Sequence, residues 1–220
     1  VSVDYASADG PASLAEGGCS LLGARRDDAD DLVRDRARRL LARRCGEDPG
    51  RFVHRPFATR LSAADYRRLA ATAETGRFLA TVTTTRGSFT AELLPREAPM
   101  TVDSFVVLAR RGFFDGTTIH RVVPDFVVQA GDPRGDGTGG PGYALRDERN
   151  ALPYVRGRIG MALSGPDSGG SQWFATLSRQ PHLDGAYTVF GEVTAGMDVV
   201  ERIEQDDRLL DVRIREETRE

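Results

Sequence analysis

The chain has 220 residues, a formal net charge of −3 and a charged fraction of 29%. These values are typical of a soluble globular protein of one domain or one and a half. They give no support to a nucleic-acid-binding protein, which usually carries a strongly basic face. No apolar run approaches the roughly 20 residues that cross a bilayer, so we expect no membrane span in this chain.

Residues 1–50 have the pattern of an α-helical segment. Within 30–44, four apolar residues fall at i, i+4, i+7 and i+8 and form one stripe: Val33, Ala37, Leu40 and Leu41. A weaker helical pattern covers residues 13–22. The pattern DxxDDLVRxRAxxLL over residues 27–41 resembles the second helix of a HEAT-type repeat. A terminal repeat of a longer array and a plain helical hairpin explain it equally well, and a protein partner could bind through this segment.

Two cysteines, Cys19 and Cys45, lie far apart in this helical region and lack the spacing of metal ligands. The favoured interpretation is a pair of buried, unpaired helix cysteines, with a disulfide as the alternative. Residues 51–77 read as a connector that contains one short helix. Ser62 has the right chemistry to cap that helix, and Gly76 lies just past its end.

From residue 78 the apolar period falls to two. Residues 78–85 and 88–93 flank Arg86 and Gly87, which predicts a β-hairpin. Thr101 is expected to cap a following helix, and Gly112 to close it. Further short strands are expected within 114–132 and at 157–163, 171–177, 187–193 and 212–214, with a second helix at 196–203. Many short strands with two separated helices predict a closed β-barrel with a helix at each end.

The segment 114–132 is mostly apolar strand, yet it contains Arg121 and Gln129. An unpaired buried guanidinium is very costly, so both residues either face water or line an apolar site that needs polar groups. Their separation of eight residues would put them on one face of a continuous strand, but Pro124 suggests a bend between them. The glycine-rich stretch 131–150 reads as a long ordered loop, which is usually functional. Its acidic residues lack the spacing of an EF-hand, and no Gly-Lys-Ser/Thr follows its glycines, so we expect no metal and no cofactor.

Three blocks carry a family resemblance. They are FDGTTIHRVVPDFVVQAGD at 114–132, GMALSGPDSGGSQWF at 160–174 and HLDGAYTVFGEV at 182–193. Together they resemble the signature blocks of the cyclophilins, a class of peptidyl-prolyl cis–trans isomerases, over about residues 78–215. The resemblance implies a mainly β fold, a closed eight-stranded antiparallel barrel capped by two helices, and residues 216–220 as a tail.

The resemblance also implies roles for individual residues. Arg121 matches the catalytic arginine, and His120 beside it matches a position that is chiefly structural. Gln129 and Gln172 match the polar groups that hold the peptide and the arginine. The walls of the family's proline site are matched here by Phe126, Val127, Phe174 and Leu183. Ala162 matches a contact of the residue before proline. Trp173 alternates with these positions, so we expect it in the core.

Four positions depart from the family's usual pattern: Val127 replaces methionine, His182 tryptophan, Tyr187 histidine and Leu163 asparagine. The tryptophan is the cyclosporin contact, so weak cyclosporin binding at most is expected. The Tyr187 ring can still fill the same wall of the proline site, and its hydroxyl can donate a hydrogen bond. The family uses the backbone at the position of Leu163, so that change is expected to be mild.

The predicted function is catalysis of rotation about X–Pro bonds in proline-containing polypeptides, assisting protein folding. Arg121 would donate to the prolyl nitrogen as the amide twists, without a covalent intermediate. The alternatives are a non-catalytic proline-peptide-binding module and a scaffold whose purpose lies in the HEAT-like part. The short connecting loops resemble those of prokaryotic members, which favours a soluble cytoplasmic or periplasmic protein.

Overall fold

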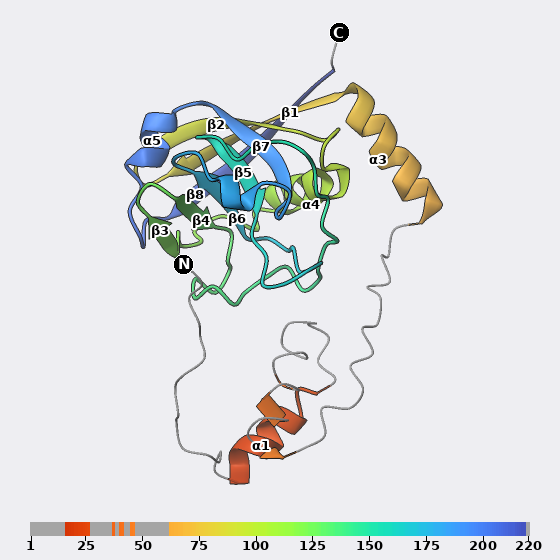
Figure 1. Cartoon of the computed structure of the whole chain (residues 1–220), viewed down its shortest axis with the longest axis vertical. Coiled ribbons are helices and arrows are strands. Elements are labelled where there is room, and N and C mark those ends of the chain that lie inside the picture. Colours follow the sequence, from red (N-terminus) through yellow and green to blue (C-terminus); the bar gives the residue numbers. More distant parts are fainter. Residues whose placement is uncertain (1–15, 27–36, 38–39, 42–44, 47–61, 219–220) are drawn as a thin grey trace. The chain divides into compact units, whose positions relative to one another are not determined.

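The structure is a computed structural model that describes residues 16–26, 37, 40–41, 45–46 and 62–218. The chain divides into two compact units, Val1–Ala58 and Thr59–Glu220. Figure 1 shows the barrel unit with its strands labelled along the chain. The candidate site lies entirely in this second unit.

The first unit contains α1 (Glu16–Gly23), which overlaps the weaker helical pattern predicted at 13–22 and extends one residue beyond it. Most of the predicted helix at 30–44 lies outside the described residues, and the HEAT-like interpretation stays a prediction. Cys19 and Cys45 form a disulfide, with their Cα atoms 6.0 Å apart. The favoured interpretation of two unpaired cysteines is therefore wrong. Their separation of 26 residues in the sequence carried no sign that folding brings the two backbones within disulfide range.

The second unit begins with α3 (Ala63–Thr75), which confirms the short helix expected before the barrel. Ser62 and Asp65 form a capping box, in which each side chain accepts from the other residue's backbone N–H. Leu69 and Ala73 are buried, and Arg68 donates to Asp103 at 2.9 Å. Since Asp103 belongs to the next helix, α3 packs on the barrel unit as part of it.

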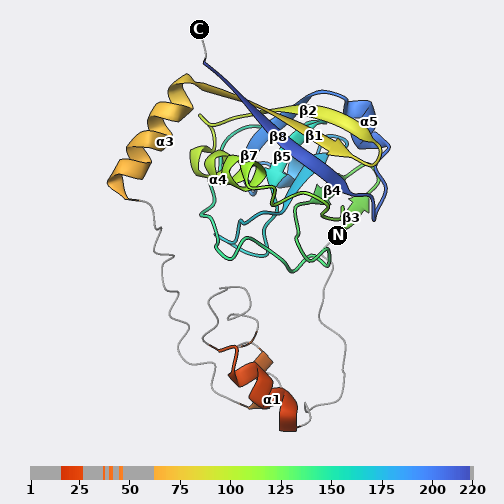
Figure 2. The same cartoon turned by 180° about the vertical axis from the view of Figure 1, so that it is seen from behind.

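Eight strands form one antiparallel sheet in the order β3-β4-β6-β5-β7-β2-β1-β8. Figures 1 and 2 show the sheet curling around a common interior. The strands are β1 (Gly76–Thr84), β2 (Gly87–Leu93), β3 (Arg121–Val123), β4 (Val127–Ala130), β5 (Arg158–Met161), β6 (Trp173–Thr176), β7 (Val189–Ala195) and β8 (Leu209–Thr218). The predicted hairpin is confirmed, but its two-residue turn lies one position earlier than predicted, at Thr85 and Arg86, because Gly87 already pairs with Thr84.

The two edge strands, β3 and β8, close the barrel through the residues that precede them. Thr118 and Arg208 form an isolated antiparallel bridge. Ile119 N–H donates to the Asp207 carbonyl at 2.7 Å, and Leu209 N–H donates to the Thr117 carbonyl at 2.9 Å. The backbone groups at this seam are thus paired, which leaves less open edge than an unclosed sheet would have.

Two helices lie on opposite sides of the barrel: α4 (Pro99–Arg110) and α5 (Met197–Glu201) (Figures 1 and 2). The expectation that Thr101 caps the first of them is wrong, because the helix begins two residues earlier with proline in its first turn. Glu148 supplies the missing cap. Its carboxylate accepts from Met100 N–H at 2.9 Å and from Thr101 N–H at 2.7 Å. Gly112 follows the helix with φ of +67°, as a terminating glycine does.

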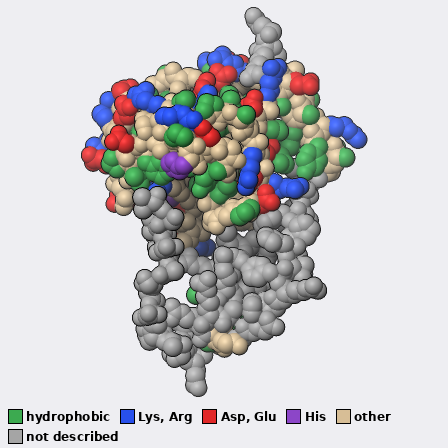
Figure 3. Space-filling model, in the orientation of Figure 1, with side chains coloured by type: hydrophobic (Ala, Val, Ile, Leu, Met, Phe, Trp, Pro, Cys, Tyr) green, Lys and Arg blue, Asp and Glu red, His purple; other side chains and the backbone are tan. Residues whose placement is uncertain are grey.

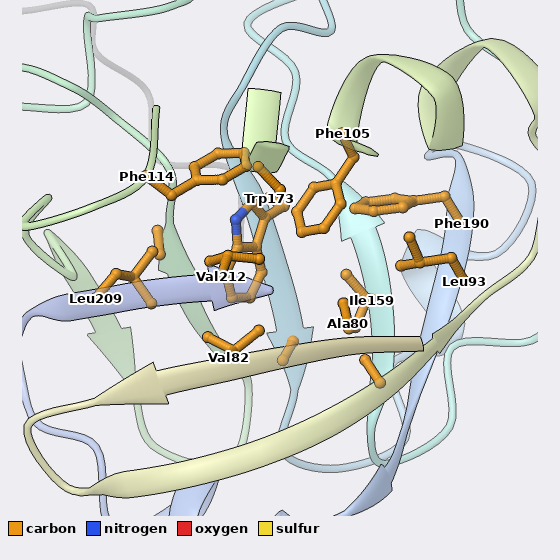
Figure 4. Close-up of a cluster of buried hydrophobic side chains, with 14 of the residues drawn as sticks. Ala80, Val82, Leu93, Phe105, Phe114, Ile159, Trp173, Phe190, Leu209 and Val212 are labelled. Atoms are coloured by element: carbon orange, nitrogen blue, oxygen red, sulfur yellow. The ribbon is translucent and has the colours of Figure 1, made fainter. Parts of the chain in front are cut away.

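The main core fills the barrel interior around Trp173 and Phe105, whose rings meet edge to face at 6.3 Å. Figure 4 shows both side chains among Val82, Phe114 and Val212. Trp173 is therefore a core residue, as its alternation with Phe174 predicted. Phe174 belongs to a second, smaller apolar cluster. Trp173 and Phe174, which are neighbours on β6, therefore point to opposite faces of the sheet.

The surface of the barrel unit carries interspersed acidic and basic side chains (Figure 3). Many of them pair across strands, as Arg77 does with Glu92 and Glu217. The last strand, β8, is longer than the predicted 212–214. The prediction was too short because several residues of this strand are charged, so the apolar alternation is visible in only part of it. Among the described residues, no helix combines the length and apolar character that a membrane crossing needs.

Candidate active site

Arg121 and Gln129 lie directly opposite each other in the antiparallel pair of β3 and β4. The chain reverses between them at residues 124–126, where Asp125 adopts a positive φ of 56°. Asp and Asn tolerate this conformation better than most residues. The two side chains share a face because they are cross-strand neighbours, whereas a parity argument along a continuous strand would not have justified it.

The Arg121 guanidinium is exposed, but it is held on this face by two contacts. Nη1 donates to Gln129 Oε1 at 3.3 Å, and the guanidinium carbon lies 5.4 Å from the centroid of the Phe126 ring. The second contact is within the range of a cation–π interaction. The charge is thus available to solvent or a ligand, while its position is defined by a strand neighbour and an aromatic ring.

A chain of amides continues from Gln129 across the sheet. Gln129 Nε2 donates to Gln172 Oε1 at 3.0 Å. Gln172 Nε2 in turn donates to the carbonyls of Gly137 and Gly139, at 3.1 and 2.9 Å. The glycine-rich loop therefore connects to Arg121 through two side chains, an arrangement in which every amide group has a partner.

The apolar side of the site is the smaller cluster of buried residues. Its buried members are Val127, Tyr154, Phe174, Leu183 and Val189, and Phe126, Ala162 and Tyr187 are among the partly buried residues packed against it. Six residues that the sequence predicted for the site thus come together here: Phe126, Val127, Ala162, Phe174, Leu183 and Tyr187. Phe126 belongs both to this cluster and to the Arg121 contact, so the cationic and apolar parts of the site adjoin.

Two predicted residues lie at the margin of the cluster. The exposed His182 ring lies 5.5 Å from the Phe126 ring, and the Tyr187 ring meets Phe174 edge to face at 6.0 Å. Leu163 differs from the rest, because its side chain packs against the main core instead of the smaller cluster. A contact between this position and a peptide would fall to its backbone, as the resemblance implies.

Tyr154 was not among the predicted site residues. Its side chain is 0% exposed and its ring stacks on Phe174 at 5.5 Å. A Cβ atom at Gly160 would lie 2.3 Å from the Tyr154 hydroxyl, so the glycine makes room for this ring. Burial raises the pKa of Tyr154 and keeps it neutral. The glycine inside a strand was the one available signal, since such a residue often marks a close approach.

His120 precedes Arg121 and is half-buried. Burial lowers the pKa of this imidazole, and the neighbouring Arg121 charge lowers it further, against an opposing effect of Asp132. A second charge beside the guanidinium is therefore disfavoured at neutral pH. Among the residues that the structure describes, no three metal-ligating side chains gather to hold a metal ion.

Comparisons with known proteins place this barrel in a family. Residues 79–219 match the family model described as cyclophilin type peptidyl-prolyl cis-trans isomerase/CLD. The chain is 47% identical over 125 residues to peptidyl-prolyl cis-trans isomerase B of Bacillus subtilis, covering 56% of this chain and 87% of the relative. It is 46% identical over 132 residues to a peptidyl-prolyl cis-trans isomerase of Helicobacter pylori, covering 58% of this chain and 81% of that relative.

A solved structure gives the same result. The crystal structure of a Cryptosporidium parvum cyclophilin-type isomerase matches with a TM-score of 0.60 and 29% identity, over 63% of this chain and 98% of that one. A second crystal structure of that protein, in the presence of the dipeptide Ala-Pro, matches with a TM-score of 0.58. The barrel fold and these matches together identify this chain as an enzyme of the prolyl isomerase class. The chain belongs to the cyclophilin-type peptidyl-prolyl cis–trans isomerase family.

Proposed function

We propose that this chain accelerates rotation about X–Pro bonds in polypeptides and thereby assists their folding, with Arg121 as the catalytic residue. The observation that carries the proposal is the position of the guanidinium. It lies over Phe126, at the margin of an apolar cluster, and is held by Gln129. A cation that is exposed yet positioned beside apolar rings suits a substrate that brings both a proline ring and an amide nitrogen.

The chemistry needs no nucleophile. Rotation about the C–N bond is opposed by about 18–20 kcal/mol because resonance gives the bond double-bond character. Twisting ends that resonance and localises the lone pair on the prolyl nitrogen. A guanidinium N–H that donates to this nitrogen binds the twisted state more strongly than the planar one, which is the condition for catalysis. Lowering the barrier by about 5 kcal/mol would speed rotation by roughly 10³–10⁴.

The proline ring would bind against the apolar cluster while the preceding carbonyl rotates. Phe126, Val127, Phe174 and Leu183 offer the apolar surface for it. Gln129 and Gln172 would hold the peptide, together with Ala162 and the backbone of Leu163. His182 and Tyr187 would contact flanking residues. Because histidine offers less apolar surface than tryptophan at position 182, only weak binding of cyclosporin is expected.

An isomerase assay on X–Pro peptides tests the proposal. Arg121→Ala is expected to lower kcat/KM by roughly 10²–10³, the usual cost of removing one preorganised donor. The matched control is Arg111→Ala, which removes an exposed arginine just past the end of α4. It should leave kcat/KM within about twofold of the wild-type value. A loss below tenfold in Arg121→Ala would favour a proline-peptide-binding module over an enzyme.

The disulfide between Cys19 and Cys45 bears on the compartment. Disulfides persist in oxidising environments and are rare in the reducing cytosol. We therefore propose that the protein works outside the cytoplasm, the second of the two compartments that the sequence left open. Trapping free thiols with an alkylating reagent directly in living source cells tests this, and a chain alkylated at both cysteines would exclude it.

A further inference from the structure

Asp132 is a fully buried carboxylate, 0% exposed, at the start of the loop that follows β4. Its two oxygens accept from two backbone N–H groups of that loop. Oδ1 accepts from Arg134 at 2.8 Å, and Oδ2 accepts from Gly137 at 2.5 Å. Such charge-assisted hydrogen bonds are stronger than neutral ones, so the carboxylate fixes the path of the loop.

The same carboxylate determines how closely the loop folds back. A Cβ atom at Gly139 would lie 2.0 Å from Asp132 Oδ1, which is impossible for any side chain. The backbone at Gly139 therefore lies directly against Asp132. Gly137 and Gly139 are the two residues whose carbonyls receive the Gln172 amide, at 3.1 and 2.9 Å. Asp132 thus holds in place the two acceptors to which Gln172 is anchored.

These two carbonyls set the orientation of both glutamines. A backbone carbonyl can only accept, so Gln172 must turn its NH₂ group to the loop and its Oε1 to Gln129. Gln129 must then donate through Nε2 and turn its own Oε1 to Arg121. The loop therefore decides that the guanidinium meets an acceptor. A flipped Gln129 would present a donor, which cannot bind a guanidinium.

We infer that Asp132 is a positioning residue for Arg121, acting through the loop at 137–139, Gln172 and Gln129. The inference rests on the proposed role of Arg121. The apolar cluster that would bind the proline ring contains neither Gln129 nor Gln172, so the effect of Asp132 should fall mainly on turnover. Peptide binding should change less, because these two glutamines are only part of the proposed contacts with the peptide.

The variant Asp132→Asn, made in the full chain, tests this. It keeps the size of the side chain but replaces one acceptor oxygen by an NH₂ group, which would face a backbone N–H. We expect kcat to fall about tenfold, with KM within about twofold, because small misplacements of a catalytic group have large effects on rate. The control is Asp136→Asn in the same loop, whose exposed carboxylate accepts from Thr138 N–H at 2.8 Å. It should leave both constants within about twofold.

A second background separates positioning from general damage. With Arg121→Ala already present, Asp132→Asn should lower the residual rate by less than about twofold, because the group that it positions is absent. An equal tenfold loss in both backgrounds, or an unchanged kcat in Asp132→Asn alone, would overturn the inference. Full activity of Arg121→Ala would overturn the proposed function itself. The failure of the inference and the failure of the proposed function therefore give different experimental results.

If Asp132→Asn does not fold, Gln172→Met serves the same purpose at a partly exposed position. A thioether cannot donate to the carbonyls of Gly137 and Gly139 and accepts only weakly from Gln129, so the orientation of Gln129 is no longer enforced. The expected result is again a fall in kcat of about tenfold that disappears in the Arg121→Ala background. A loss that persists there would contradict the inference.

Discussion

The Tyr154 ring stacks on the Phe174 ring with their centroids 5.5 Å apart, on the side of the apolar cluster where Gly160 has no side chain. Phe174 is a proposed wall of the proline site, so the surface offered to a substrate is supported from behind by a residue that never reaches solvent. The Tyr154 hydroxyl has no hydrogen-bond partner among the described residues.

The first prediction concerns that hydroxyl. Tyr154→Phe should leave the free energy of unfolding unchanged or raise it by about 1 kcal/mol, because a buried polar group without a partner is costly. The matched control is Tyr143→Phe, which removes a 2.7 Å hydrogen bond to Ser104 and should lower stability by up to about 1 kcal/mol. Urea denaturation measures both. A clear destabilisation by Tyr154→Phe would mean that its hydroxyl has a partner.

The second prediction concerns the remote cap of α4. Glu148→Ala removes the acceptor of Met100 and Thr101 N–H and should lower the free energy of unfolding of the barrel unit by about 1–2 kcal/mol. Glu97→Ala is the control, because Glu97 is exposed just before the same helix. Its effect should stay within about 0.5 kcal/mol. Equal effects of the two substitutions in thermal denaturation would rule out a special role for Glu148.

A third prediction follows from the lowered pKa of His120. In the unfolded chain this imidazole should titrate near about 6.5. Between the lower folded pKa and that value the unfolded state binds more protons, so stability rises with pH in this window and is lost as the pH falls through it. Above about pH 6.5 the contribution is complete.

Denaturation midpoints between pH 5 and 7.5 check this dependence. The slope should weaken in His120→Gln and persist in His182→Gln, because His182 is exposed at the margin of the site. An unchanged slope in His120→Gln would show that another group is responsible.

The fourth prediction concerns the disulfide of the first unit. Denatured without reductant, the chain should show no reactive thiol, and after reduction it should show two, one each from Cys19 and Cys45. Reduction should leave isomerase activity within about twofold, because the proposed catalytic groups lie in the other unit. Thiol titration followed by the activity assay measures both. Two reactive thiols before reduction would contradict the disulfide.

The sequence predicted the barrel because its strands alternate and glycine lies at or beside its turns, as Gly87 does in the hairpin of β1 and β2. The even separation of Arg121 and Gln129 suggested a shared face, but that argument assumes one continuous strand. In the structure the chain reverses between the two residues, and they share a face because they are cross-strand partners. Local patterns are reliable when the interaction is itself local, as in the Ser62 capping box.

Contacts distant in sequence were missed. Glu148 caps a helix that begins 49 positions earlier, at Pro99, and nothing near that helix indicated it. Cys19 and Cys45 gave no sign of their pairing for the same reason. Tyr154 follows a proline in an irregular segment, where periodicity places no side chain on a face. Only the fold brings it to Phe174.

The rate of cis–trans exchange on the enzyme, at saturating X–Pro peptide, tests the role of Arg121 most directly. Exchange NMR gives this rate separately from affinity, in the wild-type chain and in Arg121→Ala. The proposed function predicts that peptide affinity changes by less than about threefold while the exchange rate on the enzyme falls at least a hundredfold. An exchange rate that survives the loss of the guanidinium within tenfold would contradict it.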